Sequence, residues 1–219
     1  MLDRTDWMEA LLGIPLQLNR RTTFVAKIDD AKKEMYANCL VPQFYYNNQE
    51  YQNATIAITS PNDTLSCDLS IVKIMNNGIP FQLSMSNKAA NSRLATSVNF
   101  DNNADKRLIG DITISTIFGR DNGATSAEIN VMPSTLTIND DKWNISQARI
   151  VYNDKNINVS RFMLSHGNES ITINGVASDS HKEQMTVSLR NIDVDYILNL
   201  VNFRSVRFGG KATGRAYIK

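Results

Sequence analysis

The chain has few of the residues that carry out chemistry at neutral pH. Its 219 residues include two histidines, His166 and His181, and two cysteines, Cys39 and Cys67. Each histidine lies in its own polar turn, and neither has a further histidine, cysteine or paired carboxylate at metal-ligand spacing. The sequence patterns of catalytic serine and cysteine nucleophiles are also absent. We therefore predict that the chain is not an enzyme and has neither a cofactor nor a metal site.

The two cysteines are too few for a disulfide framework. Cys39 in "YANCLV" and Cys67 in "TLSCDLS" both lie in strand-like segments rather than in turns. Two buried thiols that pack as small hydrophobic side chains are one interpretation. A Cys39–Cys67 disulfide in an oxidising compartment is the other, and sequence spacing does not choose between them.

The sequence has no excess of charge and no long hydrophobic run. Lysine and arginine together number 23 and aspartate and glutamate 22, which leaves a net charge of +1. This balance gives no reason to expect nucleic acid or an anionic membrane surface as a partner. No segment approaches the roughly 20 apolar residues of a membrane-spanning helix. The opening "MLDRTDWMEALLG" is acidic and amphipathic, unlike a secretion signal. A soluble chain is expected, and a segment cut from a longer protein would have the same features.

Period-two alternation of apolar and polar residues dominates the rest of the sequence. In "GIPFQLSMS", Ile79, Phe81, Leu83 and Met85 alternate with small or polar residues, and many other segments repeat this pattern. Turn signals rich in asparagine and glycine separate the runs every 8 to 14 residues or so, which predicts about 14 to 17 strands. Helical spacing is limited to two short segments, 3–12 and 194–201.

The polar face of these predicted strands consists almost entirely of Ser, Thr, Asn, Asp and Lys. The apolar face then needs a cover, which would be a second sheet, a helix or an apolar ligand. So many strands in one flat sheet would also be unusual. We predict a single all-β domain over 1–219. It is a long antiparallel meander, curled into a β-groove or a sandwich-like, taco-shaped sheet, with one or two short helices. A join between two lobes is possible near 118–128.

The last fifty residues, from "SITINGVAS" through "DVDYILNLV" to "FGGKATGRAYI", resemble the repeating unit of the AsmA-like/TamB family of envelope proteins, in particular those of Bacteroidetes. The resemblance covers about 165–219, and "PSTLTINDDKWNIS" (133–146) is similar to the segment that precedes this unit. It is carried by a strand pair, a short helix at 194–201 and a closing strand at 208–217. The matching positions are Ile171, Ile173, Gly175, Ser178, Met185, Val187, Leu189, Asn191, Ile192, Phe208, Gly214 and Tyr217.

This resemblance implies a location and a function. It implies an internal fragment of a longer periplasmic protein whose N-terminus is anchored in the inner membrane. Its strands would build a β-groove that shields or conducts lipid between membranes or supports outer-membrane biogenesis. Lipid or acyl chains would be its ligand, and the outer-membrane assembly machinery a partner of the full-length protein.

The candidate lining of the groove is the alternating apolar set. Its members are Ile56, Ile58, Leu65, Leu69, Ile71, Phe81, Leu83, Ile112, Ile114, Leu136, Ile138, Ile171, Ile173, Val187 and Leu189. The same residues would form a sandwich core if two layers packed against each other.

A β-sandwich adhesin or carbohydrate-binding module is the alternative function. Aromatic residues make up 8% of the chain, and three tyrosines, Tyr45, Tyr46 and Tyr51, gather in "FYYNNQEY". Aromatic faces stack on sugars, although such residues also pack at the rims of β-proteins.

Overall fold

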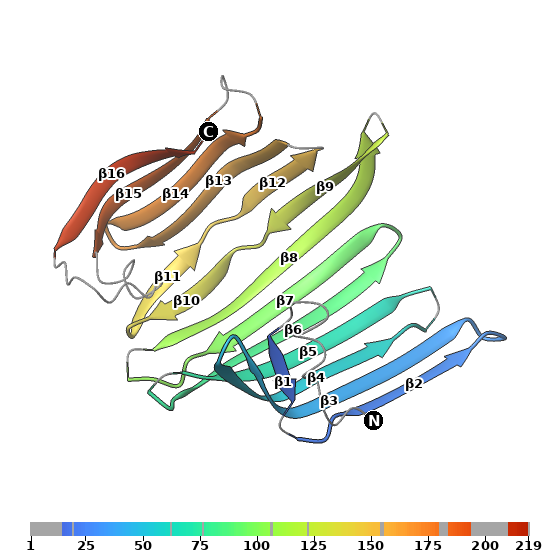
Figure 1. Ribbon diagram of the computed structural model, residues 1–219. Helices are drawn as coiled ribbons and strands as arrows, with labels where there is room; N and C mark the ends of the chain where they lie inside the picture. Colours follow the sequence, from blue (N-terminus) through green and yellow to red (C-terminus); the bar gives the residue numbers. More distant parts are fainter. Residues whose placement is uncertain are drawn as a thin grey trace. The chain divides into compact units, whose positions relative to one another are not determined.

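The computed structural model describes residues 15–18, 20–61, 63–75, 77–105, 107–121, 123–153, 156–179, 184–193 and 210–218. The predicted helices at 3–12 and 194–201 lie outside these residues. The described residues form sixteen strands joined by turns, and no helix occurs among them (Figure 1). The prediction of an all-β antiparallel meander is confirmed.

The strand order follows the chain except around β2, β9 and β12. It runs β1-β3-β4-β5-β6-β7-β8-β10-β11-β13-β14-β15-β16, with β2 paired to β3 and with β9 paired to both β8 and β12. The chain divides into two compact units. Unit one comprises Met1–Thr113 and Thr137–Asp140, and unit two comprises Ile114–Leu136 and Asp141–Lys219.

Unit one contains the strands from β1 to β7 and the first part of β8, in a single layer. Its strands are β1 (Leu16–Leu18), β2 (Thr23–Asp29), β3 (Glu34–Tyr46), β4 (Gln49–Thr59), β5 (Leu65–Ile74), β6 (Pro80–Ala90), β7 (Arg93–Asp101) and β8 (Leu108–Asp121). β1 and β2 lie one after the other along the same edge of β3.

Unit two contains the end of β8 and most of the strands that follow it. These are β9 (Ala124–Val131), β10 (Ser134–Ile138), β11 (Asp141–Ile145), β12 (Ala148–Asn153), β13 (Asn156–His166), β14 (Glu169–Ala177), β15 (Met185–Asp193) and β16 (Lys211–Ile218). The segment 118–128, which we named as a possible lobe join, forms the β8–β9 hairpin of this unit, with Asp121 opposite Ala124. The division between the units passes instead through β8, between Thr113 and Ile114.

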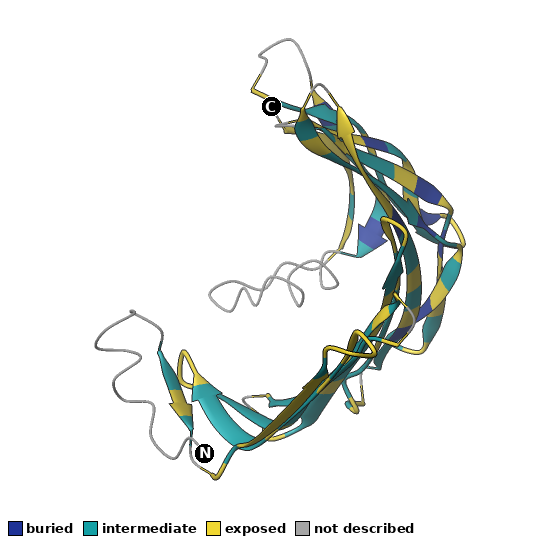
Figure 2. Cartoon of the chain, turned by 90° about the vertical axis from the view of Figure 1, so that its right-hand side faces the viewer, coloured by how far each residue is buried: buried dark blue, intermediate teal, exposed yellow. Residues whose placement is uncertain are grey.

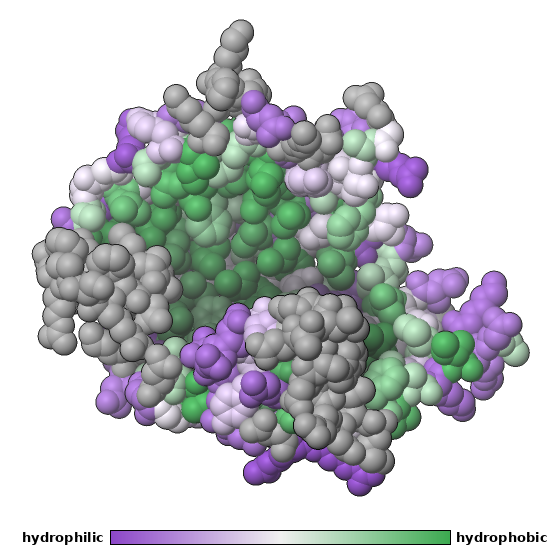
Figure 3. All heavy atoms as spheres, in the orientation of Figure 1, coloured by the Kyte–Doolittle hydropathy of each residue, from purple (hydrophilic) through white to green (hydrophobic). Residues whose placement is uncertain are grey.

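The two units differ in how deeply their side chains are buried. All the buried hydrophobic residues belong to unit two: Val131, Leu136, Trp143, Ile145, Ala148, Val159, Met185 and Ile192. Among the described residues of unit one no hydrophobic side chain reaches this level of burial. Figure 2 shows the difference, because nearly all the dark blue segments lie in the strands of unit two; the buried residue of unit one is Gly110, which has no side chain. In unit two hydrophobic side chains also gather over the sheet on the face seen in Figure 3, with hydrophilic ones at the strand ends.

The polar face of unit one is held by short side-chain bridges across neighbouring strands. The Ser86 hydroxyl on β6 donates to Asp68 on β5, and the Ser97 hydroxyl on β7 donates to Asp111 on β8 at 3.3 Å. This row follows the pair register, in which Asp68 lies opposite Ser86 and Ser86 opposite Ser97. The serines and aspartates that alternate with the apolar residues therefore share one face, as predicted from their period of two.

An ion pair joins β9 and β12 in unit two. The Arg149 guanidinium lies 2.8 Å from the Glu128 carboxylate, and Asn130 donates to the same carboxylate at 3.3 Å. These two hydrogen bonds, that of Arg149 first, lower the pKa of Glu128 to about 2.

Replacing Glu128 by glutamine should therefore change how stability depends on pH. A lowered pKa in the folded state means that the pair stabilises the protein fully above the ordinary glutamate pKa of 4.5, and that this contribution is lost as the pH falls to about 2. Thermal unfolding should show the wild type slightly more stable than Glu128→Gln at pH 7, because both side chains are partly exposed. The difference should shrink between pH 4.5 and 2. A difference that stays constant across this range would contradict the assignment.

Candidate functional site

Unit one has a hollow of about 440 Å³ on the apolar face of its sheet. Five strands line it: β1, β3, β4, β5 and β6. The lining residues are Leu16, Leu18, Val41, Phe44, Ala54, Thr55, Ile56, Leu69, Ser70, Ile71, Leu83 and Met85. A volume of this size is typical of small-molecule sites, which are concave and mainly apolar.

Strand register brings the lining residues together. Ile56 on β4 lies opposite Leu69 on β5, which in turn lies opposite Met85 on β6. One step along the same face, Ile71 lies opposite Leu83. Because side chains alternate between the two faces of a strand, these pairs form parallel apolar rows across β4, β5 and β6.

A β-bulge in β4 extends the apolar face beyond these rows. The register between β4 and β5 shifts between Gln52 and Thr55, and Asn53 has a φ of 50°. One extra residue reverses the alternation, so that Tyr51 on one side of the bulge shares a face with Ile56 on the other. Tyr51 there stacks on Phe44 of β3, with ring centroids 4.9 Å apart and planes 10° apart.

The hollow presents little that could bind a polar ligand. None of its lining residues is charged, and only Thr55 and Ser70 carry hydroxyls. These two hydroxyls bond each other at 2.6 Å. Thr55 and Ser70 are adjacent in sequence to Ile56 and Leu69, so their side chains point to the opposite face of the sheet. The hollow therefore offers apolar contact rather than hydrogen bonds.

The apolar face around the hollow is open. Ile56, within the lining, is 41% exposed, and Leu65, further along β5, is 42% exposed. Fully burying such a side chain is worth about 1.5–3 kcal/mol, so leaving these side chains partly uncovered forgoes part of that stabilisation. The described strands of unit one therefore present an apolar surface that would gain from an apolar cover.

The hollow contains four members of the predicted lining: Ile56, Leu69, Ile71 and Leu83. Five further members belong to unit one but do not line the hollow: Ile58, Leu65, Phe81, Ile112 and Ile138. Of these, Ile58 lies opposite Cys67, Leu65 opposite Ala89 and Phe81 opposite Lys73. Ile112 lies on β8 and Ile138 on β10. The remaining members belong to unit two and are not among the lining residues: Ile114, Leu136, Ile171, Ile173, Val187 and Leu189.

Two pairs of the predicted residues in unit two are neighbours across β14 and β15. Ile171 lies opposite Leu189, and Ile173 opposite Val187. Leu136, in contrast, is only 7% exposed, so it is part of the packed interior. Prediction from the sequence missed six apolar residues of the hollow: Leu16, Leu18, Val41, Phe44, Ala54 and Met85. Met85 belongs to the clearest alternation in the sequence, which was a signal that could have found it.

The three tyrosines proposed as a sugar platform do not share a face. Tyr45 and Tyr46 are adjacent on β3, so their side chains point to opposite sides of the sheet. Tyr51 lies opposite Phe44 in the register and stacks on its ring. Tyr46 and Tyr51 are thus on one face and Tyr45 on the other, so the three do not form one platform.

The two cysteines are free thiols, and both are half-buried. Cys39 lies opposite Ile56, and Ile58 lies opposite Cys67, so β4 runs between the two cysteines. Strands that are next but one in a sheet are about 9–10 Å apart, which is too far for a disulfide. The structure therefore supports the first interpretation of the sequence, in which Cys39 and Cys67 are free thiols.

His166 and Glu169 of unit two both make structural contacts with neighbouring residues. The His166 ring packs against Trp143 with centroids 5.6 Å apart, and its Nδ1 lies 2.9 Å from the Lys142 carbonyl oxygen. Glu169 is 7% exposed and bonds the Lys211 ammonium at 2.9 Å. Over the described ranges, no group of three or more His, Cys, Asp or Glu residues is placed to hold a metal ion.

Comparison with protein-family models, with curated proteins and with solved structures finds no match to this chain. The resemblance of its C-terminal residues to the AsmA-like/TamB family therefore stays a prediction.

Proposed function

We propose that this chain is a segment of a periplasmic β-groove protein that shields or conducts lipid between membranes or supports outer-membrane biogenesis. Its part in that function is to hold hydrocarbon chains against the apolar face of unit one. The observation that carries the proposal is the open hollow lined by aliphatic side chains, without a charged group. Each methylene transferred from water to such a surface contributes about 0.8 kcal/mol.

Three further features support this proposal over a sandwich core. The strands of unit one form one layer, and none of their described hydrophobic side chains is buried. The hydroxyls of Thr55 and Ser70 bond each other on the opposite face, so neither points into the hollow. The opposite face carries serines and aspartates that bridge the strands. A sheet with one polar, solvated face and one open apolar face is suited to a ligand without polar groups.

The proposed location and partners rest on the sequence resemblance. The periplasm, an inner-membrane anchor and the outer-membrane assembly machinery belong to the full-length protein that the resemblance implies. In the part of the chain that the structure describes, no helix has the length and hydropathy needed to cross a bilayer.

Replacing Ile71 by asparagine should weaken lipid binding about tenfold. Ile71 lines the hollow, and losing its apolar contact is worth about 1.5–3 kcal/mol when the side chain is fully covered. A free-energy loss of 1.4 kcal/mol corresponds to a factor of ten in affinity. Binding is measured by titrating the purified protein with a fluorescent fatty acid, and lipid carried through detergent-free purification is identified by mass spectrometry.

Val72→Asn is the matched control, because Val72 is the next residue of β5 and points to the opposite face. It should change the affinity less than about twofold, since it leaves the hollow intact. Circular dichroism checks that both variants are folded. Wild-type protein that carries no lipid and binds no fatty acid would refute the proposed function.

A further inference from the structure

A single charged residue lies on the apolar face among the described strands of unit one. Lys73 follows Ile71 by two positions on β5, and the β5–β6 register is unbroken from Leu65 to Ile74. Lys73 therefore points to the same face as Leu69 and Ile71, which line the hollow. Two residues of strand place it about 7 Å beyond Ile71, at the end of β5.

Aromatic rings flank this lysine on both sides. Lys73 lies opposite Tyr51 on β4 and opposite Phe81 on β6. Tyr51 stacks on Phe44, and Phe81 stacks on Phe100 with ring centroids 6.4 Å apart. Moving along the strands, the face therefore changes from aliphatic side chains to a row of aromatic rings with one cation in it. Aromatic rings are favoured at such boundaries between apolar and wet surroundings.

The nearest carboxylates at this end of the sheet are bound elsewhere. Glu50 accepts hydrogen bonds from Gln43 at 2.6 Å and Gln52 at 2.7 Å, and these bonds, that of Gln52 first, lower its pKa. All three side chains point away from the apolar face, since Gln52 lies opposite Val72 in the register.

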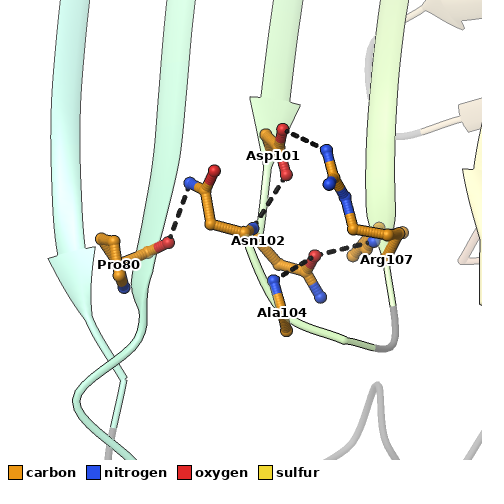
Figure 4. Close-up of polar contacts among 7 residues, drawn as sticks. Pro80, Asp101, Asn102, Ala104 and Arg107 are labelled. Atoms are coloured by element: carbon orange, nitrogen blue, oxygen red, sulfur yellow. Dashed lines mark hydrogen bonds and ion pairs between the residues drawn. The ribbon is translucent and has the colours of Figure 1, made fainter.

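Asp101 is bound within the β7–β8 loop (Figure 4). Its carboxylate accepts from the Asn103 amide at 2.8 Å and from the Arg107 guanidinium at 3.1 Å. Two asparagine side chains further fix the loop. The side-chain oxygen of Asn102 accepts a hydrogen bond from the Leu108 backbone amide at 2.8 Å. The side-chain amide of Asn103 donates to the Pro80 carbonyl oxygen at 3.2 Å. Neither Asp101 nor Glu50 is therefore placed to neutralise Lys73.

We propose that Lys73 binds the anionic head group of an amphiphile whose hydrocarbon chain lies in the hollow of unit one. The ligand class is a long-chain carboxylate or phosphate, in which an oxyanion follows directly on an apolar tail. This inference rests on the proposed function and adds a selectivity to it: the hollow binds the tail, and the lysine selects the charge of the head. An ammonium group and an oxyanion form a charge-assisted hydrogen bond at the boundary of the apolar face.

The test compares three amphiphiles with the same sixteen-carbon tail. They are hexadecanoate or hexadecyl phosphate, the neutral hexadecanol and the cationic hexadecylamine, each competing with a fluorescent fatty acid. Wild-type protein should bind the anions about three- to tenfold more tightly than the alcohol. Raising the ionic strength should reduce this preference, because the ammonium is near solvent. Inorganic phosphate should not compete at the same concentration, since it lacks the tail.

Lys73→Met keeps an apolar stem and removes the charge, so it should bind hexadecanol as the wild type does and lose the preference for anions. Lys73→Glu should reverse the preference toward hexadecylamine. Lys88→Met is the control, because Lys88 is exposed on the opposite face of β6 and should leave all affinities unchanged.

The outcomes separate the two proposals. Equal binding of all three head groups by the wild type, or an unchanged preference in Lys73→Met, would overturn the role of Lys73 and leave lipid binding in place. No binding of any sixteen-carbon amphiphile would overturn both proposals. Competition by inorganic phosphate as strong as that by hexadecyl phosphate would show an anion site that does not depend on the tail, which also overturns this inference.

Discussion

Replacing Trp143 by alanine should destabilise unit two by about 3–5 kcal/mol, the usual cost of removing a buried tryptophan. Trp143 on β11 is 1% exposed and is the largest fully buried side chain among the described residues. Its ring packs against His166 at the end of β13, and Ile145, two residues along the same face, is also buried. Its loss would leave a cavity where β11 meets β13. Urea unfolding followed by far-ultraviolet circular dichroism measures the change.

Tyr152→Ala is the matched control for this substitution. Tyr152 is also an aromatic residue of unit two, on β12, but it is 40% exposed. Its replacement should cost well under half as much, because less apolar surface is lost from a packed environment. Equal losses for the two variants would show that the burial of Trp143 does not set the stability of the unit. Neither residue lies in unit one, so lipid binding to the hollow should survive in both variants.

The sequence predicted the strands well because their pattern is local. "GIPFQLSMS" alternates without a break, and β6 runs from Pro80 through this segment to Ala90 with unbroken registers on both sides. Period two is a direct consequence of strand geometry, so it also identified which residues share a face. Ile171 and Ile173 on β14 and Val187 and Leu189 on β15 were assigned to the apolar face in this way, and the register places them opposite one another.

The bulges could not be predicted from the same pattern. Asn53 on β4 and Arg161 on β13 both have positive φ values and lie at register shifts, although neither is glycine. The extra residue in each bulge reverses the odd–even alternation of the strand. Residues that a regular alternation would assign to the polar face therefore lie on the apolar face beyond the bulge. Tyr51, for example, lies on the apolar face and stacks on Phe44.

Burial could not be predicted either, since it depends on contacts beyond the strand. The alternation of Leu69 and Ile71 on β5 resembles that of Trp143 and Ile145 on β11, yet only the second pair is buried. A period of two predicts which face is apolar and not what covers that face. Lys73 was overlooked for a related reason. A lone lysine at a strand end is unremarkable until the register shows which face it shares.

Replacing Gly175 by alanine should cost about 2–6 kcal/mol, through two separate effects. Gly175 on β14 has a φ of 119°, which a residue with a Cβ adopts only at a cost of about 1–3 kcal/mol. The added Cβ would also meet backbone atoms at the start of β15: the Cα of Met185 and the carbonyl oxygen of Gln184, the residue before the strand. Because these are backbone atoms, relief requires the strand to move, and overpacking of this kind costs about 1–3 kcal/mol more.

Two other glycines separate these effects. Gly123 in the β8–β9 turn has a φ of 85° with nothing within 4 Å of an added Cβ, so Gly123→Ala should show the backbone cost alone. Gly214 on β16 has open space and no such φ, so Gly214→Ala should be neutral or stabilise slightly by restricting the unfolded chain. The free energies of unfolding, measured in urea, should therefore fall in the order Gly214→Ala, Gly123→Ala, Gly175→Ala. Equal costs at Gly175 and Gly123 would mean that β15 yields without penalty, and the close approach of β14 to β15 would then not be what requires glycine at this position.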